Sequence, residues 1–231
     1  MSEHSNTPET PAIQPRHVFS SLPKYAAGKP PTPVEGLKQY KLSSNENPHG
    51  PIPEVARILA DFDATHRYPD PLSTKLRTAL AHHLGVDAHN IVTGAGSLGA
   101  LNQILKAFAG ASLDGTQDEV IYAWRSFEAY PILVGLLGAK SVQIPNLPNG
   151  AHDLNAMAQA VTDRTRVILV CTPNNPTGPA VTEAQMREFL TKIPENVVVV
   201  IDEAYYEFCT ASTVPAGQNA PVNGLNLLND H

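Results

Sequence analysis

Cysteine is scarce in this sequence: only Cys171 and Cys209 occur among its 231 residues. The two form no metal-ligand spacing and no disulfide framework, which favours a reducing compartment such as the cytoplasm. No apolar run approaches the roughly 20 residues of a membrane-spanning helix. The polar N-terminus also lacks the apolar segment of a signal peptide. We therefore expect a cytoplasmic protein without a membrane partner.

Positive charge is also in short supply, with 16 lysines and arginines against 22 acidic residues and a net charge of −6. This balance argues against a nucleic-acid partner. The histidines follow no i, i+4 or other ligand pattern, so no metal site is predicted. The sequence contains neither a G-x-S-x-G elbow nor a recognisable Cys–His arrangement, so hydrolase chemistry is not supported.

The order of apolar and polar segments predicts one α/β domain preceded by an arm. Residues 1–40 are rich in proline and polar side chains, and we interpret them as a disordered tail followed by an extended arm. Residues 41–231 then alternate between helical and strand patterns, which predicts a parallel sheet covered by helices. Five strands are expected, at 91–93, 119–123, 141–144, 167–170 and 197–201.

Polar residues follow two of these strands. Asn174 and Asn175 come after the apolar run that ends at 171, and Asp202 and Tyr205 come after the run that ends at 201. Ligands of open parallel sheets bind at the carboxyl ends of strands, so these side chains are expected to meet at a small-molecule site. Two alternatives stay open: the asparagines form an ordinary turn, or Asp202 is a helix cap or structural ion-pair partner.

A glycine-rich turn, Thr-Gly-Ala-Gly-Ser-Leu-Gly, occupies residues 93–99. It precedes a predicted helix, whose free N–H groups and partial positive charge suit a phosphate at Gly96, Ser97 and Leu98. The letters also match the dinucleotide fingerprint G-x-G-x-x-G. That fingerprint requires an acidic residue at the end of the next strand, about 20 residues further on. Here the next strand ends in Trp124-Arg125, and Asp118 and Glu119 lie at its start instead. A nucleotide-binding oxidoreductase and a plain strand-to-helix turn both remain alternatives.

The segment Trp124 to Tyr130 places aromatic residues directly after a strand. One of them could stack on a flat ring at the sheet edge. The alternative is that Phe127 packs in the core at the start of a helix.

Taken together, these stretches resemble fold-type I pyridoxal-phosphate-dependent aminotransferases, in particular the histidinol-phosphate aminotransferase group and its aromatic amino acid (phenylalanine) branch. The stretches that carry the resemblance follow one another along the chain: Leu42-Ser-Ser-Asn-Glu-Asn-Pro-His-Gly, Arg67-Tyr-Pro-Asp-Pro, Gly94-Ala-Gly-Ser, Trp124-Arg-Ser-Phe-Glu-Ala-Tyr-Pro, Thr172-Pro-Asn-Asn-Pro-Thr-Gly and Ile201-Asp-Glu-Ala-Tyr-Tyr-Glu-Phe. The resemblance implies a three-layer large domain, here incomplete, and the cofactor pyridoxal 5'-phosphate.

The resemblance also implies a role for each residue around the cofactor ring. Asp202 would pair with the ring nitrogen and keep it protonated, which lets the ring accept electrons from the substrate. Asn175 and Tyr205 would hydrogen-bond the phenolate oxygen of the ring. Phe127 would stack on the ring face.

Further implied contacts lie in the N-terminal half of the chain. The cofactor phosphate would be held at the start of a helix by Gly96, Ser97 and Leu98. Tyr68 would reach the phosphate bound by a neighbouring subunit, which implies a homodimer. Tyr25 and Asn45 would lie near the substrate, a small amino acid exchanged with a 2-oxo acid.

One feature of the family pattern is missing. The Schiff-base lysine of such enzymes lies beyond the Asp-x-Ala-Tyr strand, and no lysine of this chain does: they are at 24, 29, 38, 41, 75, 106, 140 and 192. We therefore expect a fragment that cannot transaminate by itself. For the full-length parent we expect transamination of an aromatic amino acid, or of histidinol phosphate, with 2-oxoglutarate. A decarboxylase of the same fold and a non-catalytic interaction protein are the alternatives.

Overall fold

The computed structural model describes residues 16–23, 29, 32–41, 43–47, 49–209 and 221–228. It falls into two compact units, one of Met1–Pro23 with Leu101–His231 and one of Lys24–Ala100. We call them the sheet unit and the helical unit, and describe each by itself. The predicted division into an arm at 1–40 and a domain at 41–231 remains a prediction.

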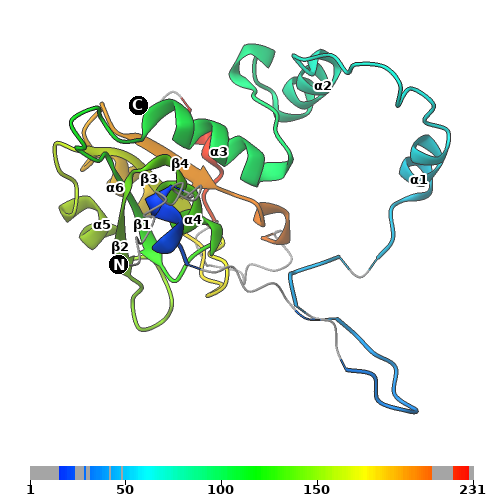
Figure 1. Ribbon diagram of the computed structural model, residues 1–231, viewed down its shortest axis with the longest axis horizontal. Helices are drawn as coiled ribbons and strands as arrows, with labels where there is room; N and C mark the ends of the chain where they lie inside the picture. Colours follow the sequence, from blue (N-terminus) through cyan, green and yellow to red (C-terminus); the bar gives the residue numbers. More distant parts are fainter. Residues whose placement is uncertain are drawn as a thin grey trace, which may run out of the picture. The chain divides into compact units, whose positions relative to one another are not determined.

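A four-stranded parallel sheet forms the centre of the sheet unit (Figure 1). Its strands are β1 (Glu119–Trp124), β2 (Lys140–Pro145), β3 (Thr165–Cys171) and β4 (Val198–Asp202), in the order β2-β1-β3-β4. β1 and β3 are buried along almost their whole length, as central strands of a parallel sheet are. The mixed α/β architecture expected from the sequence is confirmed.

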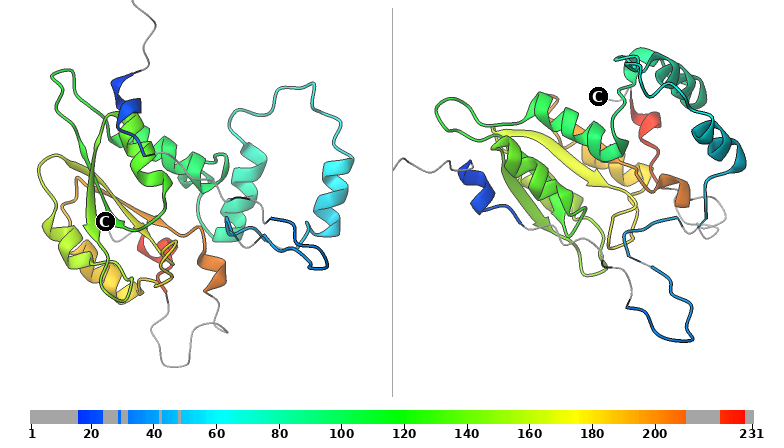
Figure 2. Two further views of the ribbon diagram at one scale, coloured as in Figure 1. Left: turned by 60° about the horizontal axis from the view of Figure 1, so that its bottom comes forward. Right: turned by 45° about the vertical axis from the view of Figure 1, so that its right-hand side comes forward.

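Helices cover both faces of this sheet (Figures 1 and 2). On one face α5 (Leu154–Gln159) and α6 (Glu183–Leu190) supply Met157, Met186 and Phe189 to a core beneath Ile121 and Ile168. On the other face, α4 (Ala129–Leu137) and the part of α3 (Gly96–Phe108) that belongs to this unit pack against the opposite side of the same strands. Side chains alternate between the two cores along each strand, which is the period of two that an extended chain imposes.

Helix ends in the sheet unit follow the signals in the sequence. Thr182 and Gln185 form a reciprocal capping box that begins α6. Asp153 accepts a hydrogen bond from the backbone N–H of Ala156 at the start of α5. Gly138 ends α4 with a φ of +80°, a conformation that a side chain would strain. The polar caps of α5 and α6 and the glycine after α4 therefore set the bounds of these helices.

The segment 221–228 closes against α6 and the end of β4. Val222 and Leu227 are buried in the core beneath α6. The carboxylate of Glu203, next to Asp202, accepts from the backbone N–H of Gly224 at 3.1 Å. Burial, followed by the charges of Glu207 and Asp202, raises the pKa of Glu203 although the Gly224 N–H opposes it.

The helical unit contains α1 (Pro53–Ala60) and α2 (Thr74–Leu84). The pair Asp70-Pro71 predicts a helix that begins at Pro71 with Asp70 as its cap. Instead Asp70 accepts from the N–H groups of Leu72 and Thr74 in a preceding turn, and Ser73 takes the cap position. Because the Asp70 carboxylate already accepts hydrogen bonds within this turn, the helix begins later than predicted. None of the helices in the described residues is both long and apolar enough to cross a membrane.

One predicted strand is wrong. Residues 91–93 adopt no strand and pair with none of the described strands. They are a short connection between the 3₁₀ turn Ala88–Asn90 and α3. A three-residue apolar run carries little strand signal, since extended chain becomes a strand only when a neighbour supplies its hydrogen bonds.

Candidate active site

The order of the strands defines where a ligand can bind in the sheet unit. β2 lies on one side of β1, whereas β3 and β4 lie on the other. The chain leaves β1 toward α4 on one face and leaves β3 toward α6 on the opposite face. The loops after β1 and β3 therefore diverge, and open parallel sheets bind ligands in the crevice at such a switch point. Phe127 lies in the first of these loops and Asn175 in the second.

Asp202 ends β4 next to this switch point. Its register partner across the ladder is Cys171, the last residue of β3. Its Oδ2 accepts a hydrogen bond of 2.7 Å from the phenol of Tyr130, and its Oδ1 accepts from the N–H of Ala204 at 3.2 Å. The side chain is half-buried, so its remaining lone pairs can meet a ligand.

Tyr130 is a functional candidate that the sequence reasoning missed. Its side chain is fully buried in α4. Burial, and then the neighbouring Cys171 and Asp202, raise the pKa of the Tyr130 phenol far above its usual range. Tyr130 therefore keeps its proton and acts as a permanent donor to Asp202. No local signal in the sequence marks it, because its partner Asp202 lies 72 residues away in the chain.

A cluster of aromatic rings lies on the β1 side of the switch point. The ring of Phe127 meets that of Tyr130 edge to face, with centroids 5.6 Å apart. Tyr130 meets Tyr122 in the same way at 5.6 Å. Phe127 and Asp202 therefore both contact Tyr130, one through its ring and one through its hydroxyl. Phe127 is half-buried, which fits both a core contact and an exposed stacking face.

Asn175 and Tyr205 complete the predicted ring contacts. Asn175 is half-buried in the loop after β3, and Tyr205 is half-buried three residues beyond β4. The ring of Tyr205 lies against that of Phe208 at 6.3 Å. Because β3 and β4 are neighbours, the structure brings Asn175, Asp202 and Tyr205 to one edge of the sheet. Their contacts with a cofactor remain predictions.

Asn174, by contrast, is buried and turned into the protein. Its amide accepts from the Ser126 hydroxyl and donates to the Arg125 carbonyl and the Thr177 hydroxyl. The sequence grouped Asn174 with Asn175 at the sheet edge. The structure separates them: Asn174 is 2% exposed and ties loops together, while Asn175 remains half-buried.

Two further buried groups lie beneath the end of β3. Burial, and then the charge of Asp202, raise the pKa of the Cys171 thiol to about 11. The imidazole Nε2 of His152 lies 2.6 Å from the Cys171 carbonyl oxygen. Burial lowers the pKa of His152, which favours a neutral ring that donates from Nε2. No group of three or more His, Cys, Asp or Glu side chains in the described residues could hold a metal ion.

The glycine-rich turn lies in the helical unit and leads into α3. A serine at the start of a helical pattern predicts a cap at Ser97. The helix begins at Gly96, so Ser97 lies inside its first turn instead. Gly96, Ser97 and Leu98 are exposed. A Cβ on Gly94 would lie 2.6 Å from the backbone nitrogen of Ala100, so this turn admits no side chain at that position. A glycine turn with exposed N–H groups at a helix start suits an anion.

The other predicted residues are placed one by one. Tyr68 is fully exposed in a loop of the helical unit. Asn45, in the same unit, is exposed and has a φ of +50°. Tyr25 lies outside the described residues.

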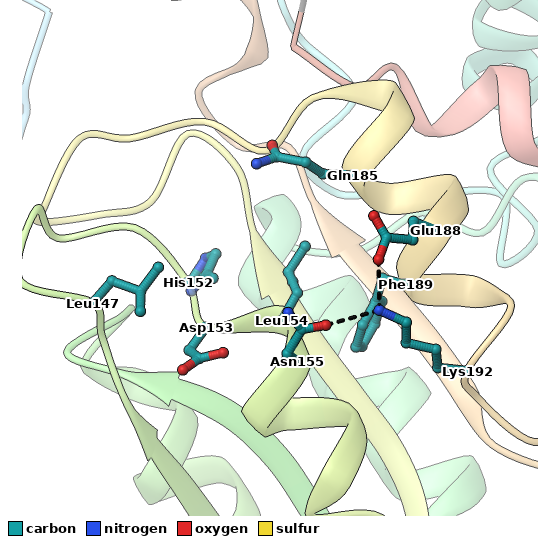
Figure 3. A pocket seen from close by; sticks show the side chains of 9 residues that line it. All are labelled: Leu147, His152, Asp153, Leu154, Asn155, Gln185, Glu188, Phe189 and Lys192. Atoms are coloured by element: carbon teal, nitrogen blue, oxygen red, sulfur yellow. Dashed lines mark hydrogen bonds and ion pairs between the residues drawn. The ribbon is translucent and has the colours of Figure 1, made fainter.

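A pocket of about 190 Å³ lies elsewhere in the sheet unit, between α5 and α6 (Figure 3). Its one cation, Lys192, already contacts Glu188 at 2.6 Å and Asn155 at 2.8 Å. Asp153 and Gln185, which also line it, are engaged in helix capping. Lys192, Asp153 and Gln185 are thus engaged within the fold.

Comparison with known proteins decides the family. The model of the family "Aminotransferase class I and II" matches residues 38–227. The chain belongs to this family. It is 48% identical over 203 residues to an aromatic amino acid aminotransferase of Streptomyces coelicolor, covering 87% of this chain and 55% of that relative. A relative of the same description from Thermobifida fusca gives the same identity and coverage. The chain thus spans about half the length of the curated relatives it matches.

Solved structures agree with this assignment. A histidinol-phosphate aminotransferase of Sinorhizobium meliloti, solved with pyridoxal 5'-phosphate, superposes with a TM-score of 0.66 at 29% identity. The match covers 74% of this chain and 46% of that one. The fold is therefore that of the fold-type I aminotransferases, as the sequence predicted. Membership of this family implies pyridoxal phosphate as the cofactor.

The residues at the sheet edge fit such a cofactor. A flat, basic heteroaromatic ring needs an anion for its nitrogen and an apolar surface for its face. Asp202 supplies the anion, held by Tyr130, and Phe127 supplies a half-buried aromatic face. Asn175 and Tyr205 add neutral hydrogen-bonding groups at the same edge.

Proposed function

We propose that the protein to which this chain belongs transfers an amino group between an aromatic amino acid and a 2-oxo acid, such as 2-oxoglutarate, with pyridoxal 5'-phosphate. The observation that carries the proposal is the Asp202 carboxylate at the end of β4, oriented by a buried phenol beside an aromatic ring. The aromatic branch is favoured over histidinol phosphate by the 48% identity to aromatic amino acid aminotransferases.

The cofactor, when bound, withdraws electrons from the substrate through its protonated ring nitrogen. Asp202 would hold that proton on the ring nitrogen, and the Tyr130 hydroxyl orients the Asp202 carboxylate through its hydrogen bond. Asn175 and Tyr205 donate to the phenolate oxygen, and Phe127 covers one ring face and excludes water. In the helical unit, Gly96, Ser97 and Leu98 bind the phosphate through N–H groups.

Two further roles follow the same proposal. Tyr68 binds the phosphate held by a second copy of the chain, so the working protein is a homodimer. Tyr25 and Asn45 contact the substrate. We also place the protein in the cytoplasm, since two unpaired cysteines suit a reducing compartment.

The chain as given would bind the cofactor without turning over substrate. None of its eight lysines follows β4, where the family's covalent lysine belongs. Transamination needs an amine that moves a proton between two carbon atoms, and no other group at this edge supplies one. The proposal for the 231 residues is therefore reversible cofactor binding and no transamination.

A decarboxylase of the same fold is the second candidate. A threonine phosphate decarboxylase of Porphyromonas gingivalis superposes with a TM-score of 0.59, but at 20% identity it supports the fold alone. The dinucleotide alternative predicts nicotinamide binding at the turn 94–99 instead of pyridoxal phosphate binding.

Titration of the purified chain with pyridoxal phosphate tests the proposal. We expect saturable binding that Asp202→Asn weakens, no lysine adduct after borohydride reduction, and no amino transfer from phenylalanine, tyrosine or histidinol phosphate. Binding of a nicotinamide dinucleotide in place of pyridoxal phosphate contradicts the proposed cofactor. A site-specific reduced lysine together with turnover contradicts the proposed inactivity.

A further inference from the structure

A hydrogen-bonded cluster joins three loops behind the candidate site. At its centre the side chain of Asn174 is 2% exposed, and Ser126 beside it is 1% exposed. The Ser126 hydroxyl donates to Asn174 Oδ1 at 2.7 Å. Asn174 Nδ2 donates to the Arg125 carbonyl at 3.0 Å and to the Thr177 hydroxyl at 2.6 Å. We call these residues the loop clamp.

The clamp reaches a third loop through Thr177. Its hydroxyl donates to the carbonyl of Gly150, between β2 and α5, at 2.7 Å. The backbone of Asn174 is engaged as well: its N–H donates to the Pro179 carbonyl at 2.9 Å, and its carbonyl accepts from Gly178 at 2.7 Å. Every polar group of this residue therefore has a partner. Such a fully satisfied buried network specifies one arrangement of the loops that it joins.

The clamp borders both ring-contacting residues. Ser126 precedes Phe127 in the loop after β1, and Asn174 precedes Asn175 in the loop after β3. These loops depart toward opposite faces of the sheet, so the β ladder does not fix the gap between them. The bonds from Asn174 to Arg125 and Ser126 span that gap directly.

We infer that Asn174 is a positioning residue that sets the separation between the Phe127 ring and the Asn175 amide, and so fixes the width of the slot for the cofactor ring. This inference rests on the proposed cofactor function. It assigns to Asn174 a role distinct from that of its neighbour. Asn175 contacts the ligand, and Asn174 connects the loop after β1 to the loop after β3. A misplacement of about 1 Å at such a site costs up to ~100-fold in function.

The test compares Asn174→Asp with Asn155→Asp. Both replace an amide by a carboxylate of the same shape, but Asn155 is exposed on α5 and bonds only to Lys192 among the described residues. Asn174→Asp keeps the acceptor for Ser126 and loses both donated bonds. We expect the affinity for pyridoxal phosphate to fall roughly 10- to 100-fold in Asn174→Asp and by less than about twofold in Asn155→Asp.

A second pair guards against loss of folding. Thr177→Val keeps the shape but removes the hydroxyl, whereas Thr177→Ser retains it, and Thr177 is exposed enough to tolerate both. We expect roughly three- to tenfold weaker binding in the valine variant and recovery in the serine variant. Trp124, the single tryptophan, ends β1 beside the clamp. The fluorescence emission maximum of Trp124 in the folded, cofactor-free protein should shift in Asn174→Asp and Thr177→Val only. If the clamp only stabilised the fold, the emission of the folded variants would not change.

The outcomes separate the inference from the proposed function. If the unsubstituted chain binds pyridoxal phosphate and the aspartate and valine variants bind equally well with unshifted emission, the inference is wrong and the cofactor proposal stands. If the unsubstituted chain does not bind, both are overturned. If Asn174→Asp does not fold, the valine and serine variants decide.

Discussion

At the scale of single residues, the contact between Tyr130 and Asp202 links the core to the site. The phenol is fully buried, keeps its proton and reaches Asp202 Oδ2 at 2.7 Å. A carboxylate that accepts such a bond is held in one orientation. A buried side chain of α4 thereby orients the Asp202 carboxylate at the proposed cofactor site.

Tyr130→Phe should separate this role from packing. The variant keeps the ring contacts with Phe127 and Tyr122 but loses the donor. We expect roughly tenfold weaker pyridoxal phosphate binding and a loss of about 1–2 kcal/mol in the free energy of unfolding. Tyr122→Phe is the matched control, because it also removes a buried phenol, one bonded to Gln143. Equal affinities in the two variants would contradict the role of Tyr130.

The raised pKa of Cys171 predicts how the free energy of unfolding changes with pH. The pKa of this thiol is raised from an ordinary value of 9.0 to about 11 in the folded chain. A group with a raised folded pKa stabilises the fold below its unfolded pKa, and this contribution is lost as the pH rises. The free energy of unfolding should therefore decline by on the order of 2–3 kcal/mol between about pH 9 and pH 11.

Denaturant unfolding of Cys171→Ala and Cys209→Ala across pH 8–10 isolates this effect, since both variants keep the tyrosines, which titrate near pH 10. Cys171→Ala should flatten the decline, and Cys209→Ala should keep most of it because Cys209 is only half-buried. Modification of the folded chain by a thiol reagent should be fast at Cys209 and slow at Cys171. A fast reaction at both thiols would show that Cys171 is not buried in solution.

The sequence predicted residues at strand ends better than residues behind them. Asp202 and Asn175 could be found because a polar residue after an apolar run marks the carboxyl end of a strand. Tyr130 and Asn174 could not be assigned in this way. Their roles depend on partners 72 and 48 residues away in the chain, a pairing that only the folded sheet creates.

At the scale of elements, the sequence predicted helix ends correctly where the capping residues interact only with their near neighbours in the chain. The capping box at Thr182 and the glycine stop after α4 act within a few residues, and both were predictable. The strand at 91–93 failed because a strand needs a partner, and the start of α2 failed because Asp70 capped a turn and not the helix.

Gly94 provides a prediction at this scale. A methyl group there would meet the backbone of Ala100 at 2.6 Å, and backbone cannot move aside cheaply. Gly94→Ala should therefore cost about 1–3 kcal/mol of unfolding free energy and weaken pyridoxal phosphate binding. Gly110→Ala is the control, since its added carbon would meet only the Leu137 carbonyl at an ordinary 3.8 Å. Unchanged stability in Gly94→Ala would mean that the turn opens in solution.

At the scale of the whole molecule, the proposed homodimer places residues of two chains around one cofactor. Tyr68 is fully exposed in the helical unit, as a residue that serves another subunit must be. The apolar side chains of α1, among them Ile58 and Leu59, are also exposed and would be available to a partner surface. Exposure alone does not identify the partner. The decisive test is therefore complementation between two variants of the chain.

Mixing two defective variants provides that test. Tyr68→Phe lacks the residue given to the partner, and Asp202→Asn lacks the residue used within its own site. In a dimer that exchanges Tyr68, each mixed pair contains one site with both residues intact and one with neither. Equal mixing should therefore restore tight binding at about a quarter of all sites, because half of the dimers are mixed. A monomer, or a dimer in which Tyr68 serves its own chain, would gain no tight sites on mixing, and calorimetric titration of the mixture distinguishes these results.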